Sequence, residues 1–248
     1  MLAVRNRKIR ARLALIAVCI LFAALAGFAF SQADVASRQD KPAAKHGQLD
    51  ARQWNFSEDG NLKLNGEWAF YQGQLLASKD FATDSAPRPS GFFAAPDVWT
   101  EYRVDGQRMK GHGYATYRLI VRTDGAQEDL ALHIPAMAPS YKVIVAGKTV
   151  AEGGAVGPDE AHSRAAYRPA IVSFKAPADE FDIIVQLSNY LFARGGMWFG
   201  LELGSVERIY EAREGKLAVD MIFFGSAIML GCYHLLVFAL RRADRSSL

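Results

Sequence analysis

The chain has 248 residues, of which half are hydrophobic and 22% are charged. This length and composition are typical of a globular protein with its own core, and they exclude a disordered chain or a disulfide-dependent miniprotein. The formal net charge of +3 comes from the two ends, because the first 12 residues carry five basic side chains and no acid, and the last eight carry a net +2. Residues 13–240 therefore carry −4, which argues against a nucleic-acid partner.

Two uncharged apolar runs stand out. Leu13–Phe30 has 18 residues behind the basic N-terminus, and Met221–Leu240 has 20 residues followed directly by two arginines. A helix of this length crosses the ~30 Å hydrocarbon core of a bilayer, so the second run predicts a transmembrane helix over 217–240. The first run predicts either a cleaved signal peptide or an N-terminal membrane anchor over 1–33, and the residues leave both readings open.

The basic residues lie on the outer side of each apolar run. The positive-inside rule then places both ends of the chain in the cytoplasm, including a tail at 241–248, and the residues between the runs outside it. In a bacterium this predicts an inner-membrane protein whose main domain lies in the periplasm. Both cysteines, Cys19 and Cys232, fall inside the apolar runs, so we expect no disulfide and no cysteine metal site in the exported part.

The exported part divides into a polar spacer and a β-rich body. Residues 34–53 contain almost no large apolar side chain, which predicts a flexible spacer. Over 54–205, short runs of alternating apolar residues recur between glycine-containing turns, as in half-buried antiparallel strands. This rhythm predicts an all-β sandwich or jelly roll. The predicted strands are Gly66–Tyr71, Tyr114–Val121, Leu130–Ile134, Tyr141–Val145, Ile171–Phe174, Phe181–Leu187 and Trp198–Leu203.

The hydrophobic period changes after residue 205. Val206, Ile209 and Tyr210 fall on one face of a helix, so we predict a helical linker over 206–216 that runs into the membrane segment. Such a joint either transmits a conformational signal or merely connects two parts. His234 lies inside the second apolar run, where a polar side chain normally faces another helix, so we expect a transmembrane helix partner or a homodimer.

Six motifs follow one another through the body: Leu64–Tyr71 (LNGEWAFY), Pro96–Trp99 (PDVW), Gly113–Leu119 (GYATYRL), Tyr141–Lys148 (YKVIVAGK), Gln186–Asn189 (QLSN) and Gly195–Trp198 (GGMW). Together they resemble the amino-terminal sugar-binding jelly roll of the β-galactosidases and β-glucuronidases, which has a galactose-binding-like fold. The catalytic carboxylates of those enzymes belong to a separate barrel domain. The resemblance therefore implies a carbohydrate-binding domain, and we expect no enzyme activity in this chain.

A second resemblance rests on the junction between body and membrane segment. Arg194–Trp198, Leu201–Gly204, Phe223–Gly225 and Gly231–Leu236 are similar to the passage from sensor domain into the first receptor helix of bacterial seven-transmembrane receptors with diverse intracellular signalling modules. This resemblance implies the extracytoplasmic sensing part of a signal-transduction receptor. Those receptors continue into a histidine kinase, diguanylate cyclase or adenylyl cyclase module, which this sequence does not contain, so we expect a fragment or a short relative.

Sugar recognition requires aromatic rings that stack on a pyranose face and polar groups that bind its hydroxyls. The candidate ligand-binding residues at strand ends or in loops of the body are Tyr114, Tyr167, Asn189, Tyr190, Arg194 and Trp198. Three tryptophans, Trp68, Trp99 and Trp198, occur within apolar strand patterns and are expected in the core, so for Trp198 burial is the alternative to ligand binding.

We predict no catalytic residue, no metal site and no cofactor. The histidines lack zinc spacing, and the sequence contains neither a phosphate-binding loop nor a nucleophile elbow. The longest polar loop, 153–168, carries Asp159, Glu160 and His162, and we expect it to be solvated. Two alternatives to a receptor stay open: a membrane-tethered carbohydrate-binding or adaptor module without signalling, and a non-catalytic fragment of a glycoside hydrolase.

Overall fold

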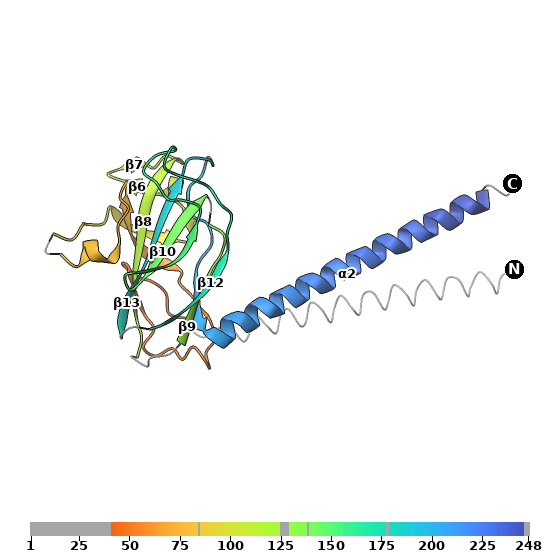
Figure 1. Ribbon diagram of the computed structural model, residues 1–248, viewed down its shortest axis with the longest axis horizontal. Helices are drawn as coiled ribbons and strands as arrows, with labels where there is room; N and C mark the ends of the chain where they lie inside the picture. The colour runs from red at the N-terminus through yellow and green to blue at the C-terminus, as the bar shows by residue number, and fades with distance from the viewer. Residues whose placement is uncertain (1–40, 84, 125–128, 138, 177–178, 246–248) are drawn as a thin grey trace. The chain divides into compact units, whose positions relative to one another are not determined.

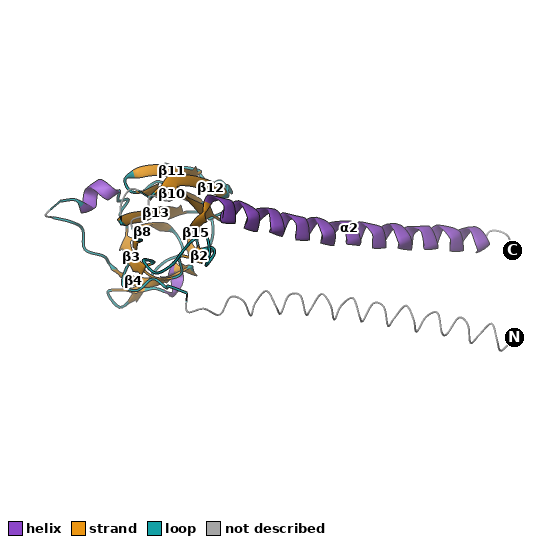
Figure 2. Cartoon of the chain, turned by 90° about the horizontal axis from the view of Figure 1, so that it is seen from below, coloured by secondary structure: helices purple, strands orange, loops and turns teal. Residues whose placement is uncertain are grey.

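A computed structural model of the chain describes residues 41–245, apart from positions 84, 125–128, 138 and 177–178. From Pro42 on, the described residues belong to one compact unit. The predicted signal peptide or anchor over 1–33 and the first part of the predicted spacer lie outside the described residues. The described part consists mainly of two larger β-sheets and one long helix (Figures 1 and 2).

The larger sheet has the strand order β11–β10–β13–β8–β3–β4, and its neighbours along this path are antiparallel. A further short strand, β1, pairs in parallel with the last residues of β8. The bounds are β11 (Lys148–Gly153), β10 (Ser140–Val145), β13 (Glu180–Asn189), β8 (Gly113–Arg122), β3 (Gly66–Gln72), β4 (Gly91–Ala95) and β1 (Gln48–Asp50).

The smaller sheet has the order β12–β9–β15–β2, all antiparallel. Its bounds are β12 (Ala170–Lys175), β9 (Asp129–Ile134), β15 (Glu202–Ser205) and β2 (Leu62–Lys63). Two short ladders and two 3-10 helices complete the body: β5 (Asp97–Val98) with β14 (Gly196–Met197), β6 (Arg103–Val104) with β7 (Gln107–Arg108), η1 (Ser78–Phe81) and η2 (Trp99–Glu101).

The two sheets pack face to face around one apolar core. Alternate residues of their strands point inward and form this core. On β13 the inward side chains are Phe181, Ile183, Val185 and Leu187, all buried in that core. These are the residues whose period-two pattern predicted the strand. The predicted all-β sandwich is confirmed, and so is the burial of Trp68 and Trp99, which are both 0% exposed.

The predicted strand Trp198–Leu203 is wrong. β14 ends at Met197, because Gly196 and Met197 pair with β5, and the next ladder begins only at Glu202, where the chain has joined the smaller sheet. Residues 198–201 cross between the two ladders. Leu201 is fully buried on this crossing, so its apolar character reflects burial and not a continuous strand.

The predicted spacer also needs correction, since residues 42–53 belong to the sandwich. Leu49 and Ala51 are buried at 0% and 1% exposure, and β1 aligns Leu49 with Val121 of β8. The segment contributes small and isolated apolar residues, and these fill gaps at the edge of the core without producing a hydrophobic run that the sequence pattern reveals.

The outward face of the larger sheet is partly covered, although alternation predicts a solvated one. Segment 73–83 lies across it and uses buried polar side chains as anchors. Thr116 Oγ1 donates to the carbonyl of Gln74 (2.8 Å), and Gln186 Nε2 donates to the carbonyl of Leu76 (2.9 Å). Thr116 and Gln186 are 0% and 8% exposed, so segment 73–83 covers positions where the alternating pattern predicts contact with solvent.

The helix α2 (Val206–Arg245) starts directly after β15 and continues without a break through the predicted boundary between linker and membrane helix. Its first turn packs on the body. Ile209 is 2% exposed, the Arg208 guanidinium donates to the carbonyl of Ser57 (2.9 and 3.1 Å), and Asn61 Nδ2 donates to the carbonyl of Arg208 (3.4 Å). By length and composition, Val206–Ala239 is one described helix able to cross a membrane.

Candidate functional site

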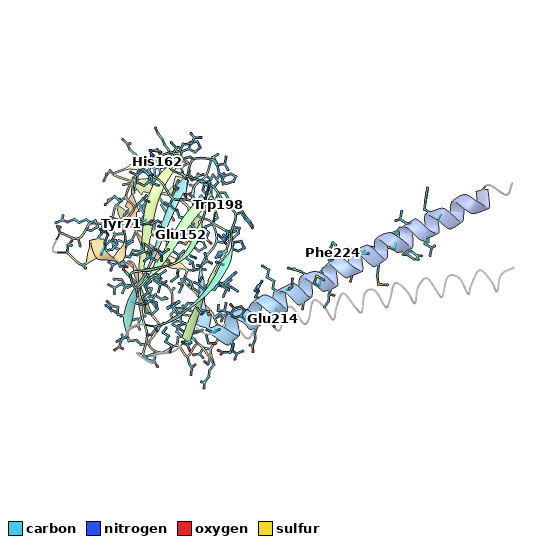
Figure 3. All side chains as sticks on the ribbon, in the orientation of Figure 1. Tyr71, Glu152, His162, Trp198, Glu214 and Phe224 are labelled. Carbon is cyan, nitrogen blue, oxygen red and sulfur yellow. The ribbon has the colours of Figure 1, made fainter. Side chains whose placement is uncertain are left out.

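Strand register brings the predicted site residues to one end of the sandwich. Gly113 at the start of β8 pairs with Asn189 at the end of β13, and Gly196 of β14 pairs with Val98. α2 starts at the other end, after Ser205, which pairs with Leu130. We call loops 109–114, 154–169 and 189–199 the distal end. Figure 1 places β6 and β7 at this end, and Figure 3 shows the labelled His162 there.

Asn189 does not face a ligand. It is 0% exposed, and its side-chain amide is fully used within the protein. Nδ2 donates to the carbonyls of Gly111 and Phe192 (both 2.8 Å), while Oδ1 accepts from the backbone N–H groups of Phe192 (2.9 Å) and Leu191 (3.3 Å). Its placement among the ligand-binding residues is therefore wrong. Asn189 shapes the turn that presents the residues after it.

Two loops of the distal end touch at Gly111. A Cβ atom on this glycine would lie 1.9 Å from the carbonyl oxygen of Ala193, so only glycine permits the approach. The Gly111 carbonyl accepts from Trp99 Nε1 (3.0 Å) as well as from Asn189, which fixes segment 109–113 against the core. The exposed Arg194 follows Ala193 and so lies beside this contact.

Tyr114 lines a pocket of about 540 Å³ between the β6–β7 hairpin and the start of β8. The lining residues are Gln72, Gly73, Val104, Asp105, Gln107, Arg108, Met109, Lys110, His112, Gly113 and Tyr114. Its size suits a small ligand, since ligand pockets are usually 300–1,000 Å³. Sequence reasoning missed Lys110 and His112, although they flank Gly111, where glycine spacing already signals a tight backbone contact.

Tyr190 directly follows β13, whose residue Ser188 pairs with Tyr114 of β8. Its pKa is raised, first because partial burial disfavours the phenolate and then because Tyr114 and Asp159 lie close enough to add negative charge. The Tyr190 phenol, already protonated at neutral pH, therefore stays protonated to a higher pH than an ordinary tyrosine. Tyr114 lines the pocket, and both tyrosines are half-exposed, so each offers a stacking surface and a hydroxyl group.

Trp198 contacts Phe192 across the 189–199 loop, with ring centroids 5.4 Å apart at an angle of 59°. Trp198 is half-buried, and its Nε1 has no hydrogen-bond partner among the described atoms. Leu191 and Phe199 nearby are 65% and 53% exposed. This side of the distal end therefore presents an apolar surface, whereas Trp198 itself is partly shielded by Phe192.

Tyr167 stands on a separate, firmly held loop. The backbone of Ala155 and Arg164 exchanges two hydrogen bonds (2.8 and 2.9 Å), the Ala166 N–H donates to Pro139 (2.8 Å), and the Tyr141 hydroxyl donates to the carbonyl of Arg168. The Tyr167 side chain is nevertheless 82% exposed. The loop is thus ordered by its backbone while its aromatic ring meets solvent.

Three serine hydroxyls hold the base of the same loop. Ser188 Oγ lies 2.7 Å from Ser140 Oγ and 2.8 Å from Ser163 Oγ, and it accepts from the Gly157 N–H (3.3 Å). Ser140 and Ser188 are fully buried. The loop predicted to be merely solvated is therefore built onto the ends of β10 and β13.

Two of the three titratable side chains at the tip of this loop, Asp159 and His162, contact each other. Asp159 accepts from the His162 backbone N–H (2.9 Å) and contacts His162 Nδ1 (2.7 Å), and these hydrogen bonds lower the pKa of Asp159. Glu160 is exposed. Within the described residues, no three His, Cys, Asp or Glu side chains come together in a way that could hold a metal ion.

No model of a known protein family matches the sequence, and no curated protein matches it. Solved structures that resemble it include a GH2 β-galacturonidase from Eisenbergiella tayi bound to glycerol (17% identity, TM-score 0.41) and a β-glucuronidase from Ruminococcus gnavus (12%, TM-score 0.44). Each match covers 58% of this chain and 24% or 28% of the other. The chain thus spans about a quarter of those proteins, and a likeness of this extent carries no information on activity or ligand.

Proposed function

We propose that this chain is the ligand-sensing part of a membrane signalling receptor, with a galactose-binding-like jelly roll outside the cytoplasmic membrane. The distal end binds a carbohydrate through Tyr114, Tyr190 and the pocket beside them. The α2 helix carries the state of the sandwich into the membrane. In a bacterium the body lies in the periplasm, and the output module belongs to a further part of the receptor.

The single observation that carries this proposal is the short covalent path from the distal end to the helix. The crossing 198–201 begins at Trp198 and leads into β15. The α2 helix follows β15 with no intervening loop. β15 is hydrogen-bonded to β9 on one side and to β2 on the other, so it moves as part of the smaller sheet. A change at residues 194–198 therefore reaches the base of α2 through one strand.

Two asparagine side chains pack closely against the glycines of this path. A Cβ atom on Gly200 would lie 2.4 Å from Asn65 Oδ1, and one on Gly204 would lie 2.2 Å from Asn61 Oδ1. Asn61 also donates to the carbonyl of Arg208 in the first turn of α2. Small shifts of packed elements are transmitted because such interiors have little free volume. Signalling further requires that the ligand bind two conformations with different affinity.

The first test is a thermal unfolding screen of the full chain in detergent micelles against monosaccharides and oligosaccharides. A ligand that binds only the folded state stabilises it by about 2.7 kcal/mol at 100 times its Kd. We expect a saturable rise of the melting temperature with at least one sugar, and its loss in Tyr114→Ala and Tyr190→Ala. Tyr210→Ala, at an exposed tyrosine on α2, is the matched control. A flat response from the folded protein would contradict carbohydrate binding.

A further inference from the structure

Basic side chains that form no ion pair with a described residue lie at the pocket beside Tyr114. Lys110 and His112 line it, and Arg194 lies beside Gly111 on the touching loop. All three are exposed, and none forms an ion pair or a side-chain hydrogen bond with another described residue. Two basic side chains thus line the pocket, and the exposed Arg194 belongs to the loop that contacts Gly111 beside it.

The remaining charges at the pocket are few. Arg108 is paired with Glu101, with 3.7 Å between Nη2 and Oε2. Asp105 is the single carboxylate among the described residues that line the pocket. It occupies the tip of the β6–β7 turn, where its φ of 49° lies in the left-handed region. The positive charges of Lys110 and of the nearby Arg194 therefore exceed the negative charge of Asp105. The surroundings of the pocket carry a local positive charge, although the overall charge of the body is negative.

Other basic side chains of the body do form ion pairs. Arg122 contacts Glu180 (2.7 Å), Lys142 contacts Glu152 (2.8 Å), and Arg118 contacts Asp182 (3.3 Å). Charges of one sign that converge on a pocket attract a ligand of the opposite sign, and the low-dielectric walls of the pocket focus that field.

We propose that the ligand is an acidic carbohydrate, one whose carboxylate lies between Lys110 and Arg194 while its ring contacts Tyr114. This inference rests on the proposed carbohydrate function and narrows it. Arg and Lys donate charge-assisted hydrogen bonds to a carboxylate, which are about twice as strong as neutral ones. The tyrosine ring supplies the surface for the apolar face of the sugar. Neutral sugars make the ring contact but not the charge-assisted hydrogen bonds.

The test compares uronates with their neutral parents by calorimetric titration of the full chain in micelles. The probes are galacturonate against galactose and glucuronate against glucose. We expect one of the acids to bind at least tenfold more tightly than its parent in dilute buffer. We also expect this preference to shrink as salt rises, because screening acts within about 10 Å at 0.1 M.

Variants of opposite sign sharpen the test. Lys110→Gln combined with Arg194→Gln should remove the preference for the acid, whereas Asp105→Asn should strengthen binding of the acid several-fold and leave the neutral parent unchanged. Asn tolerates the left-handed backbone at residue 105. Lys148→Gln, an exposed lysine at the start of β11, is the matched control and should change nothing.

The outcomes separate the two proposals. Equal binding of acid and parent, or a preference that survives Lys110→Gln with Arg194→Gln, overturns the acidic ligand and leaves carbohydrate binding intact. Binding of neutral oligosaccharides alone in the thermal screen does the same. If no sugar of either kind binds the folded protein, the carbohydrate proposal fails as well.

Discussion

The two ends of the sandwich use their polar side chains differently. At the end that carries α2, Arg208 is bonded to the Ser57 carbonyl, Asp50 is paired with Arg52 (2.6 Å), and Arg122 is paired with Glu180. At the distal end, Lys110 and Arg194 remain unpaired, and aromatic side chains are exposed.

The difference supports the proposal that one end attaches the helix and the other binds a ligand. Groups that hold two elements together are satisfied within the protein, since an unpaired buried polar group costs about 1–3 kcal/mol. The side chains that we propose for ligand binding stay exposed, while buried hydrogen bonds hold the backbone that carries them. At the distal end this support comes from Asn189, Trp99 and the serine cluster.

The largest effect should come from removing the support of the distal turn. Asn189→Ala deletes four hydrogen bonds and strands the Phe192 backbone groups, so we expect the free energy of unfolding to fall by about 2–4 kcal/mol. Urea unfolding measures this. Tyr190→Phe, one residue further on and half-exposed, should lose under ~0.5 kcal/mol. Equal losses in both variants would mean that Asn189 does not organise the turn.

The attachment end should respond next. Ile209→Ala empties a buried site in the first turn of α2, and we expect a loss of about 2–3 kcal/mol in the unfolding free energy. Tyr210→Ala, whose side chain is 40% exposed, serves as its neighbour control. Retention of full stability in Ile209→Ala would show that the helix is not docked on the body through this residue.

A smaller effect is expected at the serine cluster. Ser188→Ala removes the hydroxyl shared by Ser140, Ser163 and the Gly157 N–H, which should cost about 1–2 kcal/mol. The loosened loop 154–169 should be cut faster by a protease of low specificity. Ser173→Ala, at an exposed position on β12, should be cut at the wild-type rate. Identical digestion of all three proteins would contradict the anchoring role.

The smallest effect concerns pH and the strand that leads to α2. The contact with His133, 3.7 Å away, lowers the pKa of Glu202 below its ordinary value of 4.5. Its contribution to stability is therefore present above pH 4.5 and is lost as the pH falls through the lowered folded-state pKa. Glu202→Gln should flatten the fall of the urea midpoint between pH 5 and pH 3, and an unchanged slope would refute this contribution.

Period-two patterns could predict much of the sandwich, because inward residues such as Ile183 and Val185 report burial directly. Patterns could not predict that Thr116 and Gln186 are covered, since the covering segment 73–83 is distant in sequence from both. The same limit explains Asn189. A polar residue at a strand end suggests a ligand contact, and only the approach of Gly111 from another loop reveals that its amide is already occupied.

The residues of the distal end also differ in whether the sequence predicts them. Tyr114 and Tyr190 are found by aromatic type and position, whereas Lys110 and His112 become site residues only through the β6–β7 hairpin that closes the pocket. The α2 helix was predictable from its apolar period. Its unbroken run from β15 was not, because a sequence pattern does not distinguish a linker followed by a helix from one continuous helix.

Hydrogen exchange of the full chain in micelles, with and without the sugar that gives the largest thermal shift, tests the central claim most directly. Coupling of the distal end to α2 predicts altered exchange in the pocket loops and also in residues 202–212, which include β15 and the first turn of the helix. A change confined to loops 109–114 and 189–199, with residues 202–212 unaffected, would contradict the sensor and favour a tethered binding module.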